Sequence, residues 1–270
     1  MSSLLYFVIP VRHQATVRDW AVIKHNLAET LASIAAQTSA AWECRLVANA
    51  GADLPPLPER CTVRFVDLPP PDLPDPRQGM EPYYDAIRHD KGLRIYEGTR
   101  DLPAEAFLMP VDYDDFVSNR LAEFVARNPE APGWYIPQGY FYSGGRWYYR
   151  TRRLHRSCGT SHILKRRGLG MFETSAGLPD IAAIKRRLGS HLFNQPDLEG
   201  TPDALQPLPF PGVIYRLGVP GSASGTGGIF RAMTPPGHFL HHPLNALRRL
   251  TRYRLMTAKI RQEFSLPPSL

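Results

Sequence analysis

The residues LLYFVIPV, at positions 4–11, form a nearly unbroken apolar run. Such a run, without polar alternation, is typical of a strand buried on both faces, as in a parallel sheet. Apolar residues three to four apart follow at 25–37 and predict a helix. Two more strands are predicted at 42–51 and 61–69. This order of strand, helix and strands predicts an α/β domain with a parallel sheet.

The same periodicities predict the elements that follow. Helices are expected at 83–98, 118–128 and 179–188, and strands at 106–111 and 157–166. Ser118 is a candidate N-cap for the second of these helices. Residues 134–156 alternate aromatic and polar side chains around a Gly-Gly pair, which predicts a β-hairpin. Beyond Pro207 we expect loops, and then a basic amphipathic helix at 243–264.

Composition narrows the class of protein. The chain has 270 residues, 43% hydrophobic and 21% charged, which is ordinary for a folded domain with a sizeable core. It contains no run of 18 apolar residues, so no transmembrane helix is expected. The first residues lack a basic segment and a cleavage site, and they predict a strand rather than a signal peptide. Three cysteines without CxxC spacing predict a reducing, cytoplasmic location.

The two halves of the chain differ in charge. Residues 1–130 contain 13 Lys and Arg against 19 Asp and Glu, a net charge of −6. Residues 131–270 contain 19 against 6, a net charge of +13, and the two halves sum to +7. A basic half predicts an anionic partner, which would be nucleic acid, a membrane surface or a phosphorylated substrate.

Three carboxylates, Asp112, Asp114 and Asp115, follow the apolar run at 106–111. In open α/β sheets ligands bind at the carboxyl ends of the strands, where this cluster is expected. Carboxylates so close together repel one another unless a cation lies among them. Mg²⁺ and Mn²⁺ bind one or two carboxylates together with phosphate oxygens. The alternative is a solvated acidic turn before a helix, where Asp115 would be favourable.

Five segments, in this order along the chain, resemble the family 2-like GT-A glycosyltransferases. They are FVIPVR at 7–12, HNLAETLASIAAQT at 25–38, WECRLVANAG at 42–51, RHDKGLRIYEG at 88–98 and VDYDD at 111–115. The resemblance covers residues 4–125. It implies a GT-A fold, which is Rossmann-like with a mostly parallel central sheet and flanking helices. It further implies a UDP- or GDP-linked sugar donor, bound with Mn²⁺ or Mg²⁺, and a glycan or glycolipid acceptor.

The resemblance also implies which residues hold the metal. Asp112 and Asp114 match the two carboxylates of the D-x-D motif, and Asp115 would support them. Many GT-A enzymes take a further ligand from a late histidine, which His191 would match, with His162 as its rival. A neutral imidazole suits Mn²⁺. The alternative is that His191 is an ordinary histidine at the surface or at the edge of the core.

Further residues would contact the nucleotide and the donor phosphates. Carried over from the family pattern, these are Pro10, Val11, Arg12, Asn49, Asp90, Lys91 and Asp112. Asn49 departs from the pattern, because the family often has an aspartate there to bind the base. An amide can still bind uracil or guanine, so the departure leaves the base open. Lys91 has the alternative of a solvated helix lysine.

The second half should supply the acceptor site and a base for the acceptor hydroxyl. Asp180 and Glu173 are the candidates for this base, and Asp180 has the equal alternative of a helix N-cap. We expect residues 1–215 to form the GT-A domain, with a donor half at 1–130 and an acceptor half at 131–215. Residues 216–270 would form a C-terminal loop and helix.

Two segments of the basic half have open interpretations. The aromatic hairpin at 134–156 would be a sugar-stacking wall, a nucleic-acid surface or an edge sheet that packs its aromatics inward. The helix at 243–264 would either lie on an anionic membrane, peripheral to the inner face, or cover the core with a solvated basic face.

Other functions remain as alternatives to glycosyl transfer. A nucleotidyltransferase shares the α/β start, but it usually has glycine in the loop after the first strand, and VRHQATVRDW at 11–20 has none. A nucleic-acid-binding module would use the basic half, although this partner is the less favoured one. An inactive sugar-binding relative of the family is the third alternative.

Overall fold

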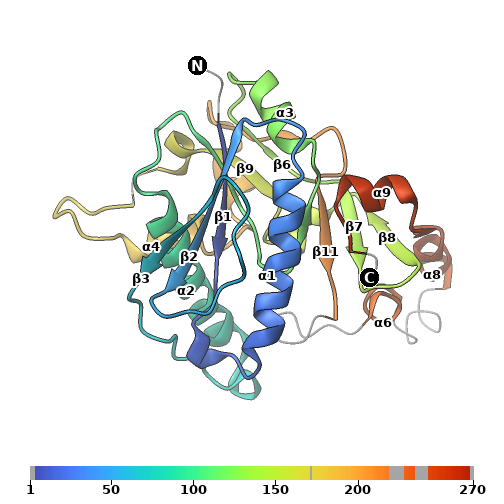
Figure 1. Ribbon diagram of the computed structural model, residues 1–270, viewed down its shortest axis with the longest axis horizontal. Helices are drawn as coiled ribbons and strands as arrows, with labels where there is room; N and C mark the ends of the chain where they lie inside the picture. The colour runs from blue at the N-terminus through green and yellow to red at the C-terminus, as the bar shows by residue number, and fades with distance from the viewer. Residues whose placement is uncertain (1–3, 171, 219–227, 235–242, 268–270) are drawn as a thin grey trace.

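The computed structural model describes residues 4–170, 172–218, 228–234 and 243–267. The chain forms two sheets, one of seven strands and one of five, with helices packed around them (Figure 1). The larger sheet has the order β10-β6-β9-β4-β1-β2-β3, and the smaller has the order β12-β8-β7-β11-β5. No helix among these residues is long and apolar enough to cross a membrane.

The larger sheet is mostly parallel, as predicted. Its strands are β1 (Leu5–Pro10), β2 (Trp42–Asn49), β3 (Cys61–Val66), β4 (Phe107–Pro110), β6 (Gly133–Tyr135), β9 (His162–Lys165) and β10 (Gln206–Pro207). The strands β4, β1, β2 and β3 run parallel to one another, and β9 runs antiparallel to both β4 and β6. The expected mixed α/β architecture with a mostly parallel central sheet is therefore confirmed.

Helices cover both faces of this sheet. The first face packs on α1 (Trp20–Ala35), whose Ile23, Leu27, Leu31 and Ile34 share a core with Leu5, Phe7 and Ile9 of β1. The second face packs on α2 (Met80–Thr99) and α4 (Ile181–Arg187) (Figure 1). Because both faces of β1 are covered, its apolar run is continuous rather than alternating.

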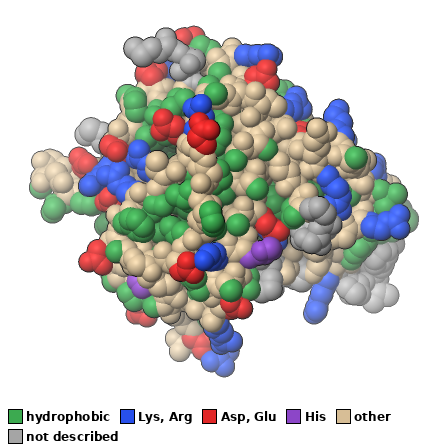
Figure 2. All heavy atoms as spheres, viewed as in Figure 1, with side chains coloured by type: hydrophobic (Ala, Val, Ile, Leu, Met, Phe, Trp, Pro, Cys, Tyr) green, Lys and Arg blue, Asp and Glu red, His purple; other side chains and the backbone are tan. Residues whose placement is uncertain are grey.

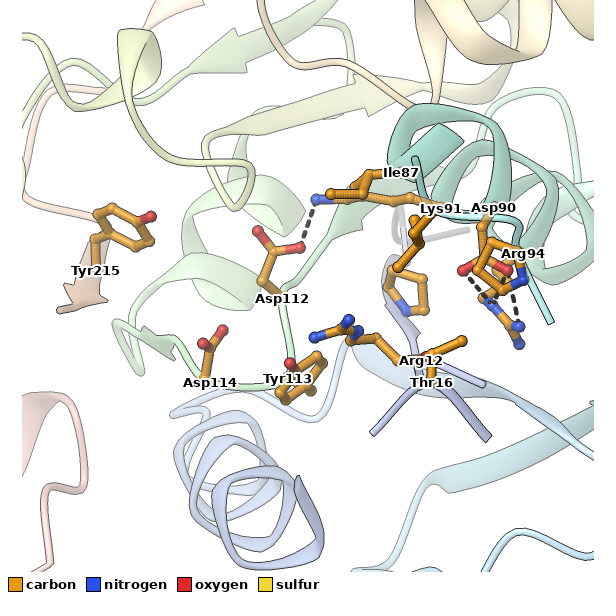
Figure 3. Close-up of a pocket in the computed structure, with 13 residues that line it drawn as sticks. Arg12, Thr16, Ile87, Asp90, Lys91, Arg94, Asp112, Tyr113, Asp114 and Tyr215 are labelled. Atoms are coloured by element: carbon orange, nitrogen blue, oxygen red, sulfur yellow. Dashed lines mark hydrogen bonds and ion pairs between the residues drawn. The ribbon is translucent and has the colours of Figure 1, made fainter. Parts of the chain in front are cut away.

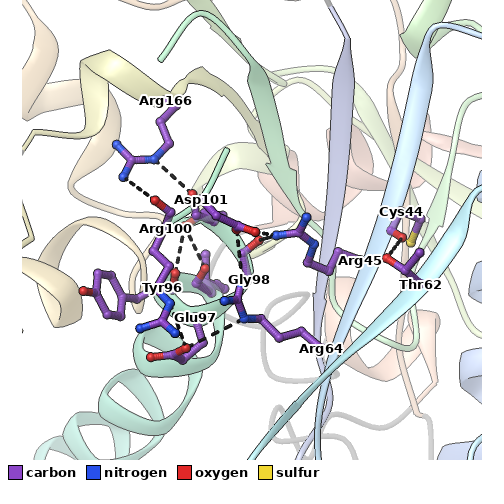
Figure 4. A network of polar contacts seen from close by, with 12 residues as sticks. Cys44, Arg45, Thr62, Arg64, Tyr96, Glu97, Gly98, Arg100, Asp101 and Arg166 are labelled. Carbon is purple, nitrogen blue, oxygen red and sulfur yellow. Dashed lines mark hydrogen bonds and ion pairs between the residues drawn. The ribbon is translucent and has the colours of Figure 1, made fainter. Parts of the chain in front are cut away.

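The helix α2 approaches the sheet closely at Gly98. A Cβ atom there would lie 2.8 Å from Val8 and from Val47, so only glycine allows this packing. At the same end of the helix, Asp101 accepts hydrogen bonds from Arg45 of β2 at 2.6 Å and from Arg64 of β3 at 2.8 Å (Figure 4). These contacts fix the helix across the strands, and they position its N-terminal half at the opposite edge of the sheet.

The hairpin predicted at 134–156 is confirmed over residues 139–151, which form part of the smaller sheet, whereas Trp134 and Tyr135 lie in β6 of the larger sheet. The strands of the smaller sheet are β5 (Phe116–Val117), β7 (Gly139–Tyr142), β8 (Trp147–Thr151), β11 (Val213–Arg216) and β12 (Tyr253–Leu255). Gly144 and Gly145, in the turn between β7 and β8, have φ angles of 89° and 80°, which glycine adopts without strain.

Most aromatics of this hairpin are buried, namely Tyr140, Phe141, Tyr142, Tyr148 and Tyr149, whereas Trp147 is exposed. The structure therefore agrees with the interpretation of an edge sheet that packs its aromatics inward.

The C-terminal region differs from the prediction. Instead of one helix at 243–264, the chain forms α8 (Pro243–Leu250), the strand β12, and α9 (Ala258–Glu263). The helical pattern is interrupted because Tyr253 pairs with Tyr149 of β8, and because the Thr257 hydroxyl caps the N-terminus of α9. The strand β11 was likewise not predicted, although it is a central strand of the smaller sheet.

Short helices complete the fold. They are α3 (Leu121–Arg127), α5 (Asn194–Leu198) and α6 (Ile229–Met233). Ser118 does not cap α3, which begins after Arg120 without a side-chain cap. The Ser118 hydroxyl instead donates to Glu263 Oε1 at 2.7 Å, so it links the start of α3 to the C-terminal helix α9.

Candidate functional site

A cleft of about 820 Å³ opens at the carboxyl ends of β1 and β4 (Figure 3). Its lining comes from β1, from the loops after β1, β3 and β4, from α2 and from β11. The lining residues are Pro10, Arg12, Thr16, Pro71, Leu73, Ile87, Asp90, Lys91, Arg94, Asp112, Tyr113, Asp114 and Tyr215. This is the edge at which ligands bind in open α/β sheets.

Asp112 and Lys91 form an ion pair in the cleft (Figure 3). Asp112 lies two residues after β4, and its backbone N–H donates to Thr160 Oγ1 at 2.9 Å. Burial disfavours the charged form of Lys91, but the adjacent Asp112 carboxylate outweighs this effect, so the pKa of Lys91 is raised. The lysine is therefore a fixed cation at the cleft and not a solvated helix residue.

Asp114 lines the same cleft, and Tyr113 separates it from Asp112 in the chain (Figure 3). Its carboxyl group is buried, and burial together with the charge of Asp112 raises its pKa to about 7. The Arg216 guanidinium opposes this shift only in part. Two carboxylates that share one low-dielectric cleft in this way favour the approach of a cation.

Asp115 is turned away from the cleft and is fully buried. Its Oδ2 atom accepts hydrogen bonds from Thr160 Oγ1 at 2.6 Å and from Cys158 Sγ at 3.3 Å, and its Oδ1 atom accepts from the Arg216 N–H at 3.2 Å. Burial is the largest cause of its strongly raised pKa. The structure thus places Asp115 as an internal support for the site, and does not bring it to the position expected of a metal ligand.

The loop before β9 holds the acidic cluster in place, and sequence reasoning missed this role. Cys158 and Thr160 donate to Asp115, and Gly159 lies against the Asp112–Lys91 pair. Residues 157–166 were predicted as a strand, but β9 begins only at His162. The signal available in the sequence was the run of small residues CGTS, which lets a backbone approach charged side chains closely.

The residues expected at the nucleotide divide into two groups. Pro10, Arg12, Asp90 and Lys91 line the cleft, whereas Val11 is buried beneath it. Asn49 also lies outside the lining residues.

Both ends of the Asn49 amide are held within the protein. Its Oδ1 atom accepts from Arg94 Nη1 at 2.8 Å, and its Nδ2 atom donates to the Leu68 carbonyl at 2.6 Å. Arg94 is buried and also pairs with Asp90, four residues earlier on α2 (Figure 3). Asn49 therefore anchors the arginine at the base of the cleft.

His191 lines a different cavity. About 600 Å³ of open space is bounded by His155, Arg156, His162, His191, Leu192, Gln195, Pro196 and Glu199. Burial lowers the pKa of His162 to about 3 and that of His191 to about 4, so both rings are neutral near pH 7. The buried atoms His155 Nδ1, His162 Nε2 and His191 Nε2 have no hydrogen-bond partner among the described residues.

Neither candidate base lines the cleft. Asp180 is the N-cap of α4 and accepts a hydrogen bond from the Ala183 N–H at 3.0 Å. Glu173 accepts a hydrogen bond from the Tyr96 hydroxyl at 2.8 Å. Asp180 thus has the capping contact that was its alternative interpretation.

The strand β11 contributes two residues that sequence reasoning did not single out. Tyr215 lines the cleft. Arg216 forms a buried ion pair with Glu29 of α1 at 2.5 Å and lies over the Phe116 ring at 5.0 Å. The positive charge of Arg216 also lowers the pKa of the neighbouring Asp114. Arg216 therefore interacts with a carboxylate of the cleft and with a carboxylate of α1.

The residues of the cleft fit Mg²⁺ or Mn²⁺. Asp112 and Asp114 offer hard carboxylate oxygens, and because burial and the charge of Asp112 raise the pKa of Asp114, an added cation would stabilise its ionised form. Among the residues described, no group of three or more His, Cys, Asp or Glu side chains is placed to hold a metal ion. A cation bound by the two aspartates would complete its shell with phosphate oxygens and water.

A scan against models of protein families and a search of curated proteins found no match for this chain.

Proposed function

We propose that the protein is a glycosyltransferase that takes a sugar from a nucleotide-diphosphate donor. One observation supports this proposal above the others. Asp112, Asp114 and Lys91 meet in a single cleft at the carboxyl edge of the parallel sheet, where α/β folds bind phosphorylated ligands. The segments that resemble GT-A glycosyltransferases contribute all three residues.

The proposed donor site combines two carboxylates with fixed cations. Asp112 and Asp114 would hold Mn²⁺ or Mg²⁺, and a metal bound there supplies positive charge that stabilises the departing diphosphate. Lys91 already carries its charge beside Asp112, within reach of a phosphate group. Arg12 lines the same cleft and would provide a second cation for the diphosphate.

The proposed acceptor site is the histidine cavity next to this cleft. Arg156 bounds this cavity, and Gly159, three residues later in the same loop, lies against Asp112 and Lys91 of the cleft, so the two spaces are neighbours. A neutral imidazole offers one donor and one acceptor, so it suits sugar hydroxyls, which also have both. Leu192 and Pro196 add apolar surface to the cavity. The acceptor would therefore be a glycan or the sugar of a glycolipid.

Calorimetric binding of UDP and GDP, with and without Mn²⁺, tests the proposal. We expect one nucleotide to bind in a metal-dependent way, and Asp114→Asn to weaken this binding by at least about tenfold, because it removes one charged ligand. Asp53→Asn is the matched control, since Asp53 is exposed and pairs with Lys24 away from the cleft.

The identity of the bound nucleotide would then select which UDP- or GDP-linked sugars to test for transfer. If neither nucleotide binds with any metal, the acidic cluster is not a donor site and the proposal fails. If Asp114→Asn and Asp53→Asn weaken binding equally, the cleft is not where the nucleotide binds.

A further inference from the structure

The helix α8 turns its leucines to solvent. Leu244, Leu247 and Leu250 are 74%, 57% and 42% exposed, and they recur every three residues along the helix. This spacing gathers them on one side of the helix. An amphipathic helix of a globular domain normally buries its apolar side in the core. The interpretation that this helix covers the core is therefore wrong for α8.

Neighbouring elements extend the apolar surface. Leu255 of β12 is 50% exposed, and its Cα partner in β8 is Trp147, which is also exposed. The strand β12 follows α8 after two residues, so this pair adjoins the helix. Arg249 of α8 donates to the Met233 carbonyl at the end of α6, and Figure 1 draws α6, α8 and α9 at one end of the molecule.

The same end is strongly basic. Residues 229–263, from the start of α6 to the end of α9, contain seven Lys and Arg but a single acidic residue, Glu263. Arg248, Arg252 and Arg254 are exposed next to the leucines. Glu263 is turned inward to Ser118, so it does not neutralise them. In Figure 2, blue Lys and Arg side chains and green hydrophobic ones lie along the right-hand edge, where Figure 1 places α8 and α9.

We propose that this end of the protein docks on a membrane surface that contains anionic phospholipids. We call it the basic apolar end, and it comprises Trp147, Leu244, Leu247, Leu250, Leu255, Arg248, Arg252 and Arg254. The leucines enter the boundary between headgroups and acyl chains, while the arginines remain at the level of the lipid phosphates. Trp147 suits the same boundary, because indole rings favour the membrane interface.

Charge favours lipid over a second copy of the chain. In a two-fold dimer this end would face itself, and its arginines would oppose like charges. An anionic leaflet instead attracts each exposed arginine, and the leucines add apolar burial. The exposed leucines and arginines therefore fit an anionic lipid surface better than they fit the same surface on a second copy of the chain.

The basic apolar end lies close to the cleft without covering it. In the smaller sheet, β12 is three strand spacings from β11, which carries Tyr215 of the cleft. Three spacings correspond to about 14 Å. A molecule anchored in the membrane by its lipid part would therefore be within reach of the cleft, although docking itself does not depend on the proposed chemistry.

Vesicle flotation tests the inference. The full chain is mixed with vesicles of phosphatidylcholine alone, or of phosphatidylcholine with phosphatidylglycerol, at low and at high salt. We expect flotation with the anionic vesicles at low salt and release at high salt. Leu244→Asn with Leu247→Asn, and separately Arg248→Gln with Arg252→Gln, should each lower the partition coefficient on the order of tenfold.

Two control variants and one further measurement decide the interpretation. Leu178→Asn removes a leucine that is 64% exposed ahead of α4, and Arg127→Gln removes an exposed arginine of α3. Both should float like the wild type. No flotation with anionic vesicles, or equal losses in the controls, would overturn the inference.

A wild-type dimer in sedimentation velocity that dissociates in the double leucine variant would also overturn it, in favour of a second copy. Circular dichroism of each variant shows whether it remains folded. Nucleotide binding by the variants reports on the cleft separately, so failure of docking and failure of the proposed function are distinguishable.

Discussion

A Cβ atom added to Gly159 would lie 2.5 Å from Oδ2 of Asp112. It would lie equally close to Nζ of Lys91. The backbone at Gly159 is therefore pressed against the ion pair of the cleft. The next residue, Thr160, binds the backbone of Asp112 and the side chain of Asp115, so this loop fixes the acidic cluster from outside.

We expect Gly159→Ala to fold but to bind nucleotide on the order of tenfold more weakly. The added methyl must displace the end of Asp112 or Lys91, which are flexible side chains, so overpacking should cost only about 1–3 kcal/mol of stability. Calorimetry and thermal unfolding measure the two effects. Gly228→Ala is the control, because its Cβ would approach no atom closer than 3.6 Å. Equal affinities for Gly159→Ala and the wild type would contradict the role of this contact.

Asp114 should make stability depend on pH. Its pKa is raised from 3.8 to about 7 by burial and by the charge of Asp112, so the folded chain holds this proton more tightly than the unfolded chain. The resulting stability is fully present below about pH 4 and is lost as the pH rises through about 7.

Asp114→Asn cannot ionise and should escape this loss. Relative to the wild type, it should gain about 2–4 kcal/mol between pH 4 and pH 8. Urea unfolding in the presence of a chelator measures the difference at each pH. Parallel profiles for the two proteins would show that the Asp114 carboxyl titrates normally. Adding Mn²⁺ in place of the chelator should stabilise the wild type at high pH, because a bound cation favours the ionised carboxyl.

Asp180 should behave as a helix cap and not as a base. Its carboxylate accepts the Ala183 N–H and lies outside the cleft. Asp180→Ala should lower stability by about 1 kcal/mol, and Asp180→Asn, which retains a capping oxygen, by much less. Thermal unfolding of both variants measures this, and nucleotide binding should be unchanged. A loss of transfer activity in Asp180→Asn, with stability intact, would instead support a catalytic role.

His191 should not determine metal-dependent nucleotide binding. Its unpartnered Nε2 atom belongs to the histidine cavity, and His191 is not among the residues that line the cleft. We expect His191→Ala to change the affinity for nucleotide with Mn²⁺ by no more than about twofold, whereas loss of a metal ligand typically costs far more. Calorimetry of the variant with and without Mn²⁺ is the measurement. A large, metal-specific loss would restore His191 as a ligand.

Local sequence predicted the first half of the fold well. The apolar run at 4–11 became a buried strand because helices cover both faces of the sheet, and the helical periodicity at 25–37 became most of α1. The helix begins earlier than predicted because Asp19 caps it. Asp112 and Asp114 were predicted to lie at a strand end, and the structure brings both into the cleft.

Contacts between distant segments could not be predicted in the same way. The helix predicted at 243–264 is confirmed at α8, but the chain then forms a strand because Tyr253 pairs with β8. Local periodicity does not reveal such a pairing partner, so the strand could not be predicted. Asp115 and Asn49 looked like site residues by position, yet their side chains are held by Thr160 and Arg94.

Periodicity and chain order were enough to predict the α/β class, the parallel sheet and the strand end at which the carboxylates gather. They could not show which carboxylates face the cleft, that Gly159 and Arg216 support them, or that the leucines of α8 face outward. These features depend on burial and hydrogen bonds between residues far apart in the chain, such as Asp115 and Arg216, and local sequence does not encode such contacts.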